Sequence, residues 1–135
     1  MGTRGRKSKA DLSVVAHVVE IERAQPLTEL SPEESEEWQV IVNRMPADWF
    51  PPETYGLLAQ YCRHRVRARR LATLINEIEE SGKFDIKQYI DLLKAEDIQS
   101  RALTSLATKM RISQQSQQAR RKSAPKAGKR PWEFE

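Results

Sequence analysis

The sequence predicts an all-α fold, in which a short helix is followed by a long antiparallel helical hairpin. Three observations support this fold class. Apolar residues between residues 31 and 113 recur at spacings of three and four, as they do on one side of a helix. Pro46 and Gly82, residue types that interrupt helices, divide this region into three segments. Residues 14–21 are rich in β-branched side chains, but no second run of this kind offers them a partner strand.

The first predicted helix begins with a capping box. Ser31 is the expected N-cap, Pro32 occupies the first helical position, and Glu34 follows three residues after the cap. Pro46 is expected to end the helix. Its amphipathic stripe consists of Trp38, Ile41, Val42 and Met45.

A rigid connector and a long second helix are predicted to follow. Residues 48–52 contain two aromatic residues and two prolines, and each proline holds the residue before it in an extended conformation. We expect Trp49 and Phe50 to close one end of the core. The second helix is predicted from about residue 53 to about Ser81, with Gly82 as its C-cap.

The third helix is predicted from residue 85 or 86 to near Ser113, and it completes a helical oligomerisation domain over residues 29–113. Residues 1–28 and 114–135 are predicted to be basic, mostly disordered tails, because they offer too little apolar surface to form a core. Within the first tail, residues 14–21 could form either a strand or a short helix.

Composition argues against several classes of protein. With 39% hydrophobic and 31% charged residues, the chain has no apolar run approaching the roughly 20 residues of a membrane span. One cysteine cannot form an internal disulfide, and together with two histidines it argues against a structural zinc site. The scattered glycines exclude a phosphate-binding loop of the Walker type. We therefore expect a cytosolic protein that is not an enzyme and uses no cofactor or metal.

The net charge of +4 conceals strongly segregated charges. Residues 1–9, 63–70 and 120–130 contain basic but no acidic side chains, whereas residues 29–37 contain five glutamates and no base. Basic ends indicate a polyanionic partner, nucleic acid first, although basic tails also serve solubility. The predicted DNA-binding residues are Arg4, Arg6, Lys7, Lys9, Arg63, Arg67, Arg70, Arg120, Arg121, Lys122, Lys126, Lys129 and Arg130. For the three of these in the second helix, a merely solvated face is an equal alternative.

The second helix presents two apolar stripes on opposite sides, one through Leu58 and Cys62 and the other through Leu71 and Ile75. A contact within a hairpin buries one stripe per helix, so the second stripe is expected to pack on another chain. The predicted oligomer interface consists of Tyr55, Leu58, Leu71, Ile75, Ile78, Leu103, Leu106, Met110, Arg65 and Arg69. The two arginines are expected to form ion pairs with the acidic start of the first helix, in the same or a neighbouring subunit.

Four stretches of the chain resemble the small terminase subunits of tailed bacteriophages. They are the basic Gly-Arg-Lys opening, the stretch from Leu30 to Trp38, the long helix through residues 57–62, and the close of the last helix from Leu106 to Ser116. The resemblance implies a homo-oligomeric ring of about eight to eleven copies. It further implies that the ring binds double-stranded viral DNA in the host cytoplasm and regulates the large, ATP-hydrolysing nuclease subunit.

Trp132 and Phe134 are two aromatic residues flanked by acids in the basic second tail. Aromatic side chains serve as anchors when a short peptide docks in a groove, so we expect them to dock on the large terminase subunit. The alternative is that this segment folds back onto its own subunit. Two other functions stay open: a dimeric or tetrameric helical DNA-binding regulator, and a structural helical adaptor.

Overall fold

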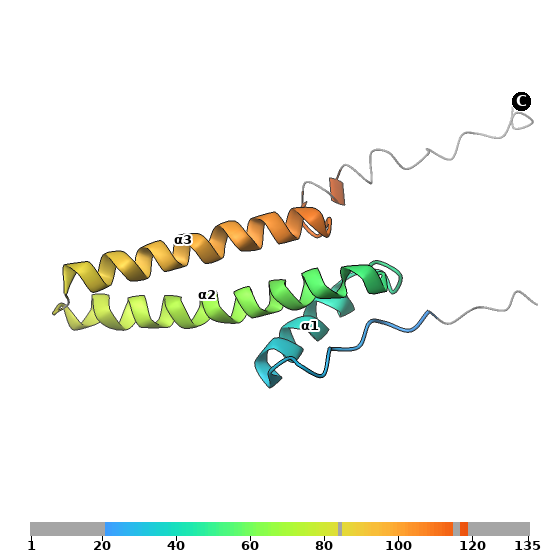
Figure 1. The fold of residues 1–135 in the computed structure, drawn as a ribbon, viewed down its shortest axis with the longest axis horizontal. Coiled ribbons are helices and arrows are strands. Elements are labelled where there is room, and N and C mark those ends of the chain that lie inside the picture. Colours follow the sequence, from blue (N-terminus) through green and yellow to red (C-terminus); the bar gives the residue numbers. More distant parts are fainter. Residues whose placement is uncertain (1–20, 84, 115–116, 119–135) are drawn as a thin grey trace, which may run out of the picture.

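The structure is a computed structural model, and it describes residues 21–83, 85–114, 117 and 118. Over these residues it is all-helical, as predicted, without a strand. The elements in chain order are α1 (Pro32–Arg44), the short 3-10 turn η2 (Pro52–Thr54), α2 (Tyr55–Ser81) and α3 (Ile86–Lys109). Helices α2 and α3 run antiparallel as a long hairpin, and α1 lies against the first half of α2 (Figure 1).

The start of α1 has the predicted capping box. The Glu34 backbone N–H donates to the Ser31 hydroxyl at 3.3 Å, and the Ser31 N–H donates to the Glu34 carboxylate at 2.9 Å. These two bonds satisfy backbone donors that a helix leaves unpaired in its first turn. The helix ends at Arg44, two residues before Pro46, as the proline requires.

The segment before α1 belongs to the packed part of the chain. The Arg23 guanidinium donates to the carbonyl oxygens of Val42 and Met45 at 2.8 and 2.6 Å, and so satisfies the end of α1. The Trp38 indole N–H donates to the Ala24 carbonyl at 3.0 Å, and Ala24 is buried. Packing therefore begins several residues ahead of the predicted domain boundary at residue 29.

The turn between α2 and α3 follows the sequence prediction. Gly82 has φ +63°, the left-handed conformation that glycine adopts without the steric cost of a Cβ, and it ends α2 after Ser81. Asp85 caps α3, since its carboxylate accepts from the Lys87 N–H at 3.1 Å. The second helix begins two residues later than predicted, because η2 precedes it.

Helix α3 ends earlier than the predicted position near Ser113. Arg111 adopts φ +56°, its N–H donates to the Thr108 carbonyl at 3.1 Å, and the Ile112 N–H donates to the Ala107 carbonyl at 3.0 Å. This bonding pattern is a Schellman motif, which terminates a helix. Glycine usually occupies the left-handed position of this motif. Because arginine occupies it here, the sequence does not indicate the end of the helix.

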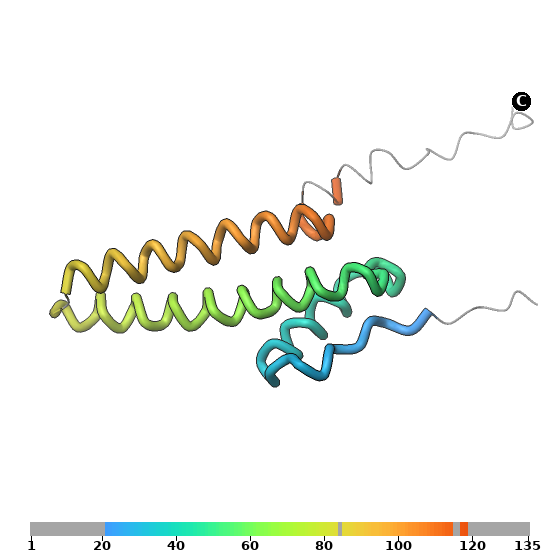
Figure 2. The backbone as a smooth tube through the Cα atoms, in the orientation of Figure 1, coloured from blue at the N-terminus to red at the C-terminus, as the bar shows by residue number. Residues whose placement is uncertain are grey.

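Each apolar stripe of α2 faces another helix of the chain, but the second is only partly covered, since Leu74 is 47% exposed. Figure 2 shows α1 and α3 on opposite sides of α2, so α1 covers one stripe and α3 the other. On the α1 side, Leu58 and Cys62 are fully buried in one cluster with Trp38. On the α3 side, Ile75 is buried. The short first helix thus covers the stripe through Leu58 and Cys62, and α3 covers part of the other stripe. Packing of α2 on another chain stays a prediction.

The connector closes the core as predicted. Phe50 is buried, and the partly buried Trp49 donates its indole N–H to the Met110 carbonyl at 3.1 Å. This bond ties the connector to the end of α3. The core thus lies at the end of the hairpin where α1, the connector and the last turn of α3 meet.

Candidate functional site

Several residues of the predicted oligomer interface lie inside the subunit. Leu58 is fully buried, and Ile75, Leu106 and Met110 are only 5–6% exposed. These four residues therefore pack in the interior of the single subunit, and their contacts between chains stay a prediction. The other apolar members of the predicted interface are half-buried: Tyr55, Leu71, Ile78 and Leu103.

The apolar surface that remains open lies on the outer side of α3. Ile86, Ile90 and Leu93 follow one another at spacings of four and three residues and are 68%, 43% and 37% exposed. We call these three residues the α3 apolar face. Leu74 on α2 and Ile98 on α3 are further exposed apolar residues of the hairpin. Helical spacing does not separate such a face from a core stripe, so the sequence alone did not assign it to the surface.

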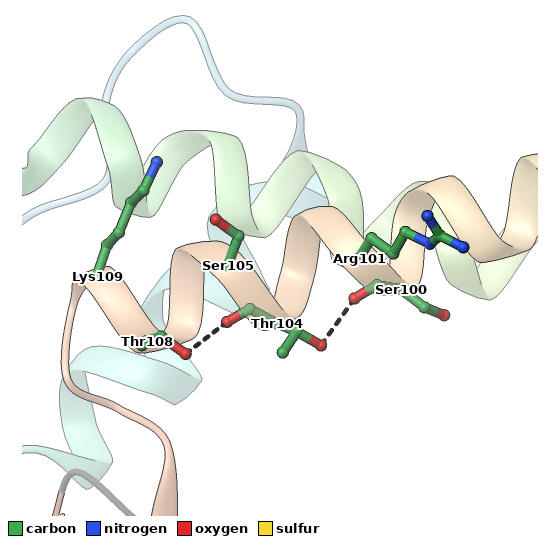
Figure 3. Close-up of a pocket in the computed structure, with 6 residues that line it drawn as sticks. All are labelled: Ser100, Arg101, Thr104, Ser105, Thr108 and Lys109. Carbon is green, nitrogen blue, oxygen red and sulfur yellow. Dashed lines mark hydrogen bonds between the residues drawn. The ribbon is translucent and has the colours of Figure 1, made fainter.

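The second half of α3 is small and polar on its outer surface. Thr104 and Thr108 donate their hydroxyls to the carbonyls four residues earlier, each at 2.9 Å (Figure 3). A shallow, open depression is lined by Ser100, Arg101, Thr104, Ser105, Thr108 and Lys109. Its threonine hydroxyls are already used as donors, and its only charged groups are two cations, so it offers neither a nucleophile with a base nor a carboxylate pair.

The acidic start of α1 and the arginines of α2 form ion pairs. Arg65 donates to the Glu37 carboxylate at 3.3 Å, and Arg69 donates to the other oxygen of the same carboxylate. Glu37 is the buried acid of this cluster, with its side chain 11% exposed. The ion pairs predicted for these two arginines are therefore present, and they form within one chain.

Two of the three arginines predicted to contact DNA from α2 are also paired within the chain. Arg63 lies 3.1 Å from Glu29, and Arg70 lies 3.0 Å from Glu33. Over the described part of the chain, Arg67 makes no ion pair. These acids offset part of the positive charge on this face of α2 and link Arg63 and Arg70 to Glu29 and Glu33 at the start of the first helix. DNA contact by the three arginines stays a prediction.

The net positive charge of the chain comes from the residues outside the described ranges. Within them, thirteen lysines and arginines face fifteen aspartates and glutamates, so the described part is slightly acidic although the whole chain carries +4. The remaining predicted DNA contacts lie outside the described residues: Arg4, Arg6, Lys7, Lys9, Arg120, Arg121, Lys122, Lys126, Lys129 and Arg130. Trp132 and Phe134 lie outside them as well.

Cys62 and His64 both take part in the packing of the subunit. Burial raises the pKa of Cys62 to about 12, which keeps its thiol protonated and unreactive. His64 shares a hydrogen bond of 2.6 Å with the Gln99 side chain across the hairpin. In the described ranges, no three His, Cys, Asp or Glu side chains come together as a metal site. No described helix has the length and apolar character needed to span a membrane.

No protein-family model, curated protein or solved structure matches this chain. The resemblance to small terminase subunits therefore depends on the residue pattern alone. The features that bear on function are the α3 apolar face, the internal pairing of the α2 arginines, and the position of the basic segments.

Proposed function

We propose that the chain is the small terminase subunit of a tailed bacteriophage. In this role it forms a homo-oligomeric ring, binds double-stranded viral DNA at the packaging site, and regulates or recruits the large ATPase and nuclease subunit. It is itself not an enzyme. The observation that carries the proposal is the α3 apolar face, an ordered row of exposed isoleucine and leucine on a rod-like hairpin.

A second copy of the chain suits this face, because the hairpin offers complementary charges. Lys87 and Lys94 lie beside the α3 apolar face, while Glu77 lies about one helical turn from the exposed Leu74 on α2. Within the described part of the chain, none of these three charged groups forms an ion pair. Packing of α3 from one copy on α2 of the next would bury apolar groups and pair opposite charges.

Such a contact joins two different surfaces, so it is heterologous. Heterologous contacts close into rings when the rotation between copies permits. An antiparallel contact of one surface with itself would instead give a dimer, the arrangement expected of the helical DNA-binding regulator. Native mass spectrometry of the purified chain separates these outcomes: about eight to eleven copies support the ring, and a dimer or tetramer supports the regulator.

We assign DNA binding to the basic segments at both ends of the sequence and to Arg63, Arg67 and Arg70 of α2. If about five phosphates are neutralised per binding unit, the logarithm of the affinity should fall against the logarithm of salt concentration with a slope near −4 to −5. Replacing Arg4, Arg6, Lys7 and Lys9 by alanine should weaken binding to all DNA sequences alike, because phosphate contacts read no sequence. Binding that ignores salt would favour the structural adaptor over both DNA-binding functions.

The contact with the large subunit is assigned to Trp132 and Phe134. Deleting residues 131–135 should leave the number of copies and the DNA affinity unchanged, while abolishing co-purification with the large subunit. If the truncated chain still binds and stimulates the large subunit normally, the contact lies elsewhere on the ring.

A further inference from the structure

A groove with both apolar and polar walls lies between α1 and α2, at the opposite end of the hairpin from its turn. Its apolar walls are Val40 and Ile41 of α1, Met45 directly after α1, Tyr61 of α2 and Ile112, which follows α3. We call this the α1 groove. Its volume of about 360 Å³ lies at the small end of the range for ligand sites, which suits one or two aromatic side chains.

The rim of the α1 groove has spare positive charge. Glu37, the acid on this rim, already accepts from Arg65 and Arg69. Arg44 also lines the groove, and among the described residues it has no ion-pair partner. Val40 is 47% exposed inside the groove. The groove therefore suits an occupant with apolar side chains next to acidic ones.

The chain itself supplies such a segment. In residues 131–135, Trp132 and Phe134 alternate with Glu133 and Glu135. In an extended peptide, alternate side chains point to opposite sides, so both aromatics can face the groove while the acids point away from its floor. The long side chain of Arg44 at the rim can then reach up to Glu133. The segment lies in a stretch whose other charged residues are basic, so its acids are a local departure from the charge pattern.

The path of the chain places this segment within reach. Gln117 lines the α1 groove, and its side-chain amide donates to the Ile112 carbonyl at 3.2 Å and to the Met45 sulfur at 3.8 Å. From Gln118, fourteen residues lead to Trp132 and can span up to about 45–50 Å. Closing a loop of this length costs little more than closing a shorter one, because the entropy grows only with the logarithm of length.

We propose that the α1 groove binds the Trp132–Phe134 segment of its own chain. Trp132 or Phe134 packs on Val40, Ile41 and Tyr61, and Glu133 pairs with Arg44. The inference stands without the proposed function. Where that function holds, the groove has a further consequence: the large subunit must compete for the segment, so docking is regulated by its release.

The decisive experiment compares methyl NMR spectra of the intact chain and the Trp132→Ala, Phe134→Ala variant. Neither substitution touches the described core, so both proteins fold. We expect the signals of Val40, Ile41 and Ile112 to shift, while those of Leu93 and Ile98 on α3 stay in place. Unchanged groove signals overturn the proposal. So does a shift that is lost on tenfold dilution, because a segment from the same chain docks independently of concentration.

A charge swap tests the pairing of Arg44 with Glu133. A labelled peptide of residues 129–135, added to the variant without the aromatics, should bind about fivefold more weakly after Arg44→Glu, as expected for a partly exposed ion pair. A peptide with Glu133→Arg should recover this loss on the Arg44→Glu chain. Val40→Glu should abolish binding, whereas Gln39→Glu, the same charge on the neighbouring exposed residue, should not. Equal binding by all four chains overturns the proposal, and none of these measurements needs DNA or the large subunit.

Discussion

Replacing Ile90 by aspartate should disrupt assembly while leaving the subunit folded. Ile90 lies in the middle of the α3 apolar face and is 43% exposed, so a carboxylate there reaches water in the isolated subunit. Leu106 provides the contrast, because it is 6% exposed in the core. Leu106→Asp should unfold the subunit, since it buries a charge without a partner.

The expected loss of contact free energy follows from the exposed fractions of the three side chains in the α3 apolar face. Ile86, Ile90 and Leu93 together expose about one and a half side chains, and complete burial of such a side chain stabilises by about 1.5–3 kcal/mol. Covering the α3 apolar face should therefore contribute roughly 2–4 kcal/mol per contact. Ile90→Asp removes about 1 kcal/mol of this and adds the cost of desolvating a carboxylate, at least a further 2 kcal/mol. The contact should weaken roughly hundredfold or more.

The assay is native mass spectrometry, with circular dichroism at the same concentration. Ile21→Asp is the matched control, because Ile21 is the same residue type and is 53% exposed but lies ahead of α1, on neither helix of the hairpin. We expect Ile90→Asp to yield folded monomers and the control to assemble like the unmodified chain. An Ile90→Asp protein with unchanged copy number would refute the assignment of this face to assembly.

The remaining predictions concern the subunit itself. Glu37→Ala should lower the free energy of unfolding, measured in urea titrations, by about 1–2 kcal/mol, because Arg65 and Arg69 lose their buried acceptor but can still reach water. A change below about 0.5 kcal/mol would mean that this ion-pair cluster does not stabilise the fold. Arg111→Gly should raise the free energy of unfolding by about 0.5–1 kcal/mol, because φ +56° is strained for arginine and not for glycine. An unchanged or lower urea midpoint would contradict this prediction. Burial raises the pKa of Cys62 to about 12 from an ordinary value near 9, so above pH 9 the unfolded chain releases a proton that the folded chain retains. Stability should then fall by about 1.4 kcal/mol per pH unit from this group alone up to about pH 12. Unfolding curves of Cys62→Ala should lack that contribution, and an identical alkaline slope in both proteins would rule it out.

The helix boundaries that could be predicted are those set by local chemistry. The capping box of Ser31 and Glu34 and the left-handed Gly82 both act within a few residues, so the sequence displays them directly. The end of α3 could not be predicted in this way, because Arg111 occupies the position that usually holds glycine. Apolar spacing continues through Ile112, and periodicity alone therefore extended the helix.

The surfaces were harder to predict, because exposure depends on which helix covers which face. The stripe through Leu58 and Cys62 has the same spacing as the face through Ile86 and Ile90, yet only the first is buried. The first stripe is buried because α1 folds back onto α2, and this contact joins parts of the chain that are distant in sequence. The charge pattern was more informative: the acidic block and the arginine block have opposite sign, and they pair through Glu37, Arg65 and Arg69.

The distribution of buried residues makes the two ends of the hairpin different in stability. The end that packs with α1 contains Trp38, Leu58 and Met110, whereas beyond Val66 on α2 only Ile75 is buried. Near the turn, the two helices are joined by the hydrogen bond of 2.7 Å from Tyr89 to Glu79, which is exposed. Few buried apolar groups and exposed hydrogen bonds characterise regions that open locally. The α3 apolar face lies in this weaker half, so a partner chain that covers it would also stabilise the half of the subunit that the internal core supports least. Assembly and the order of the distal hairpin would then be coupled, because binding to the closed hairpin lowers its free energy relative to the frayed one.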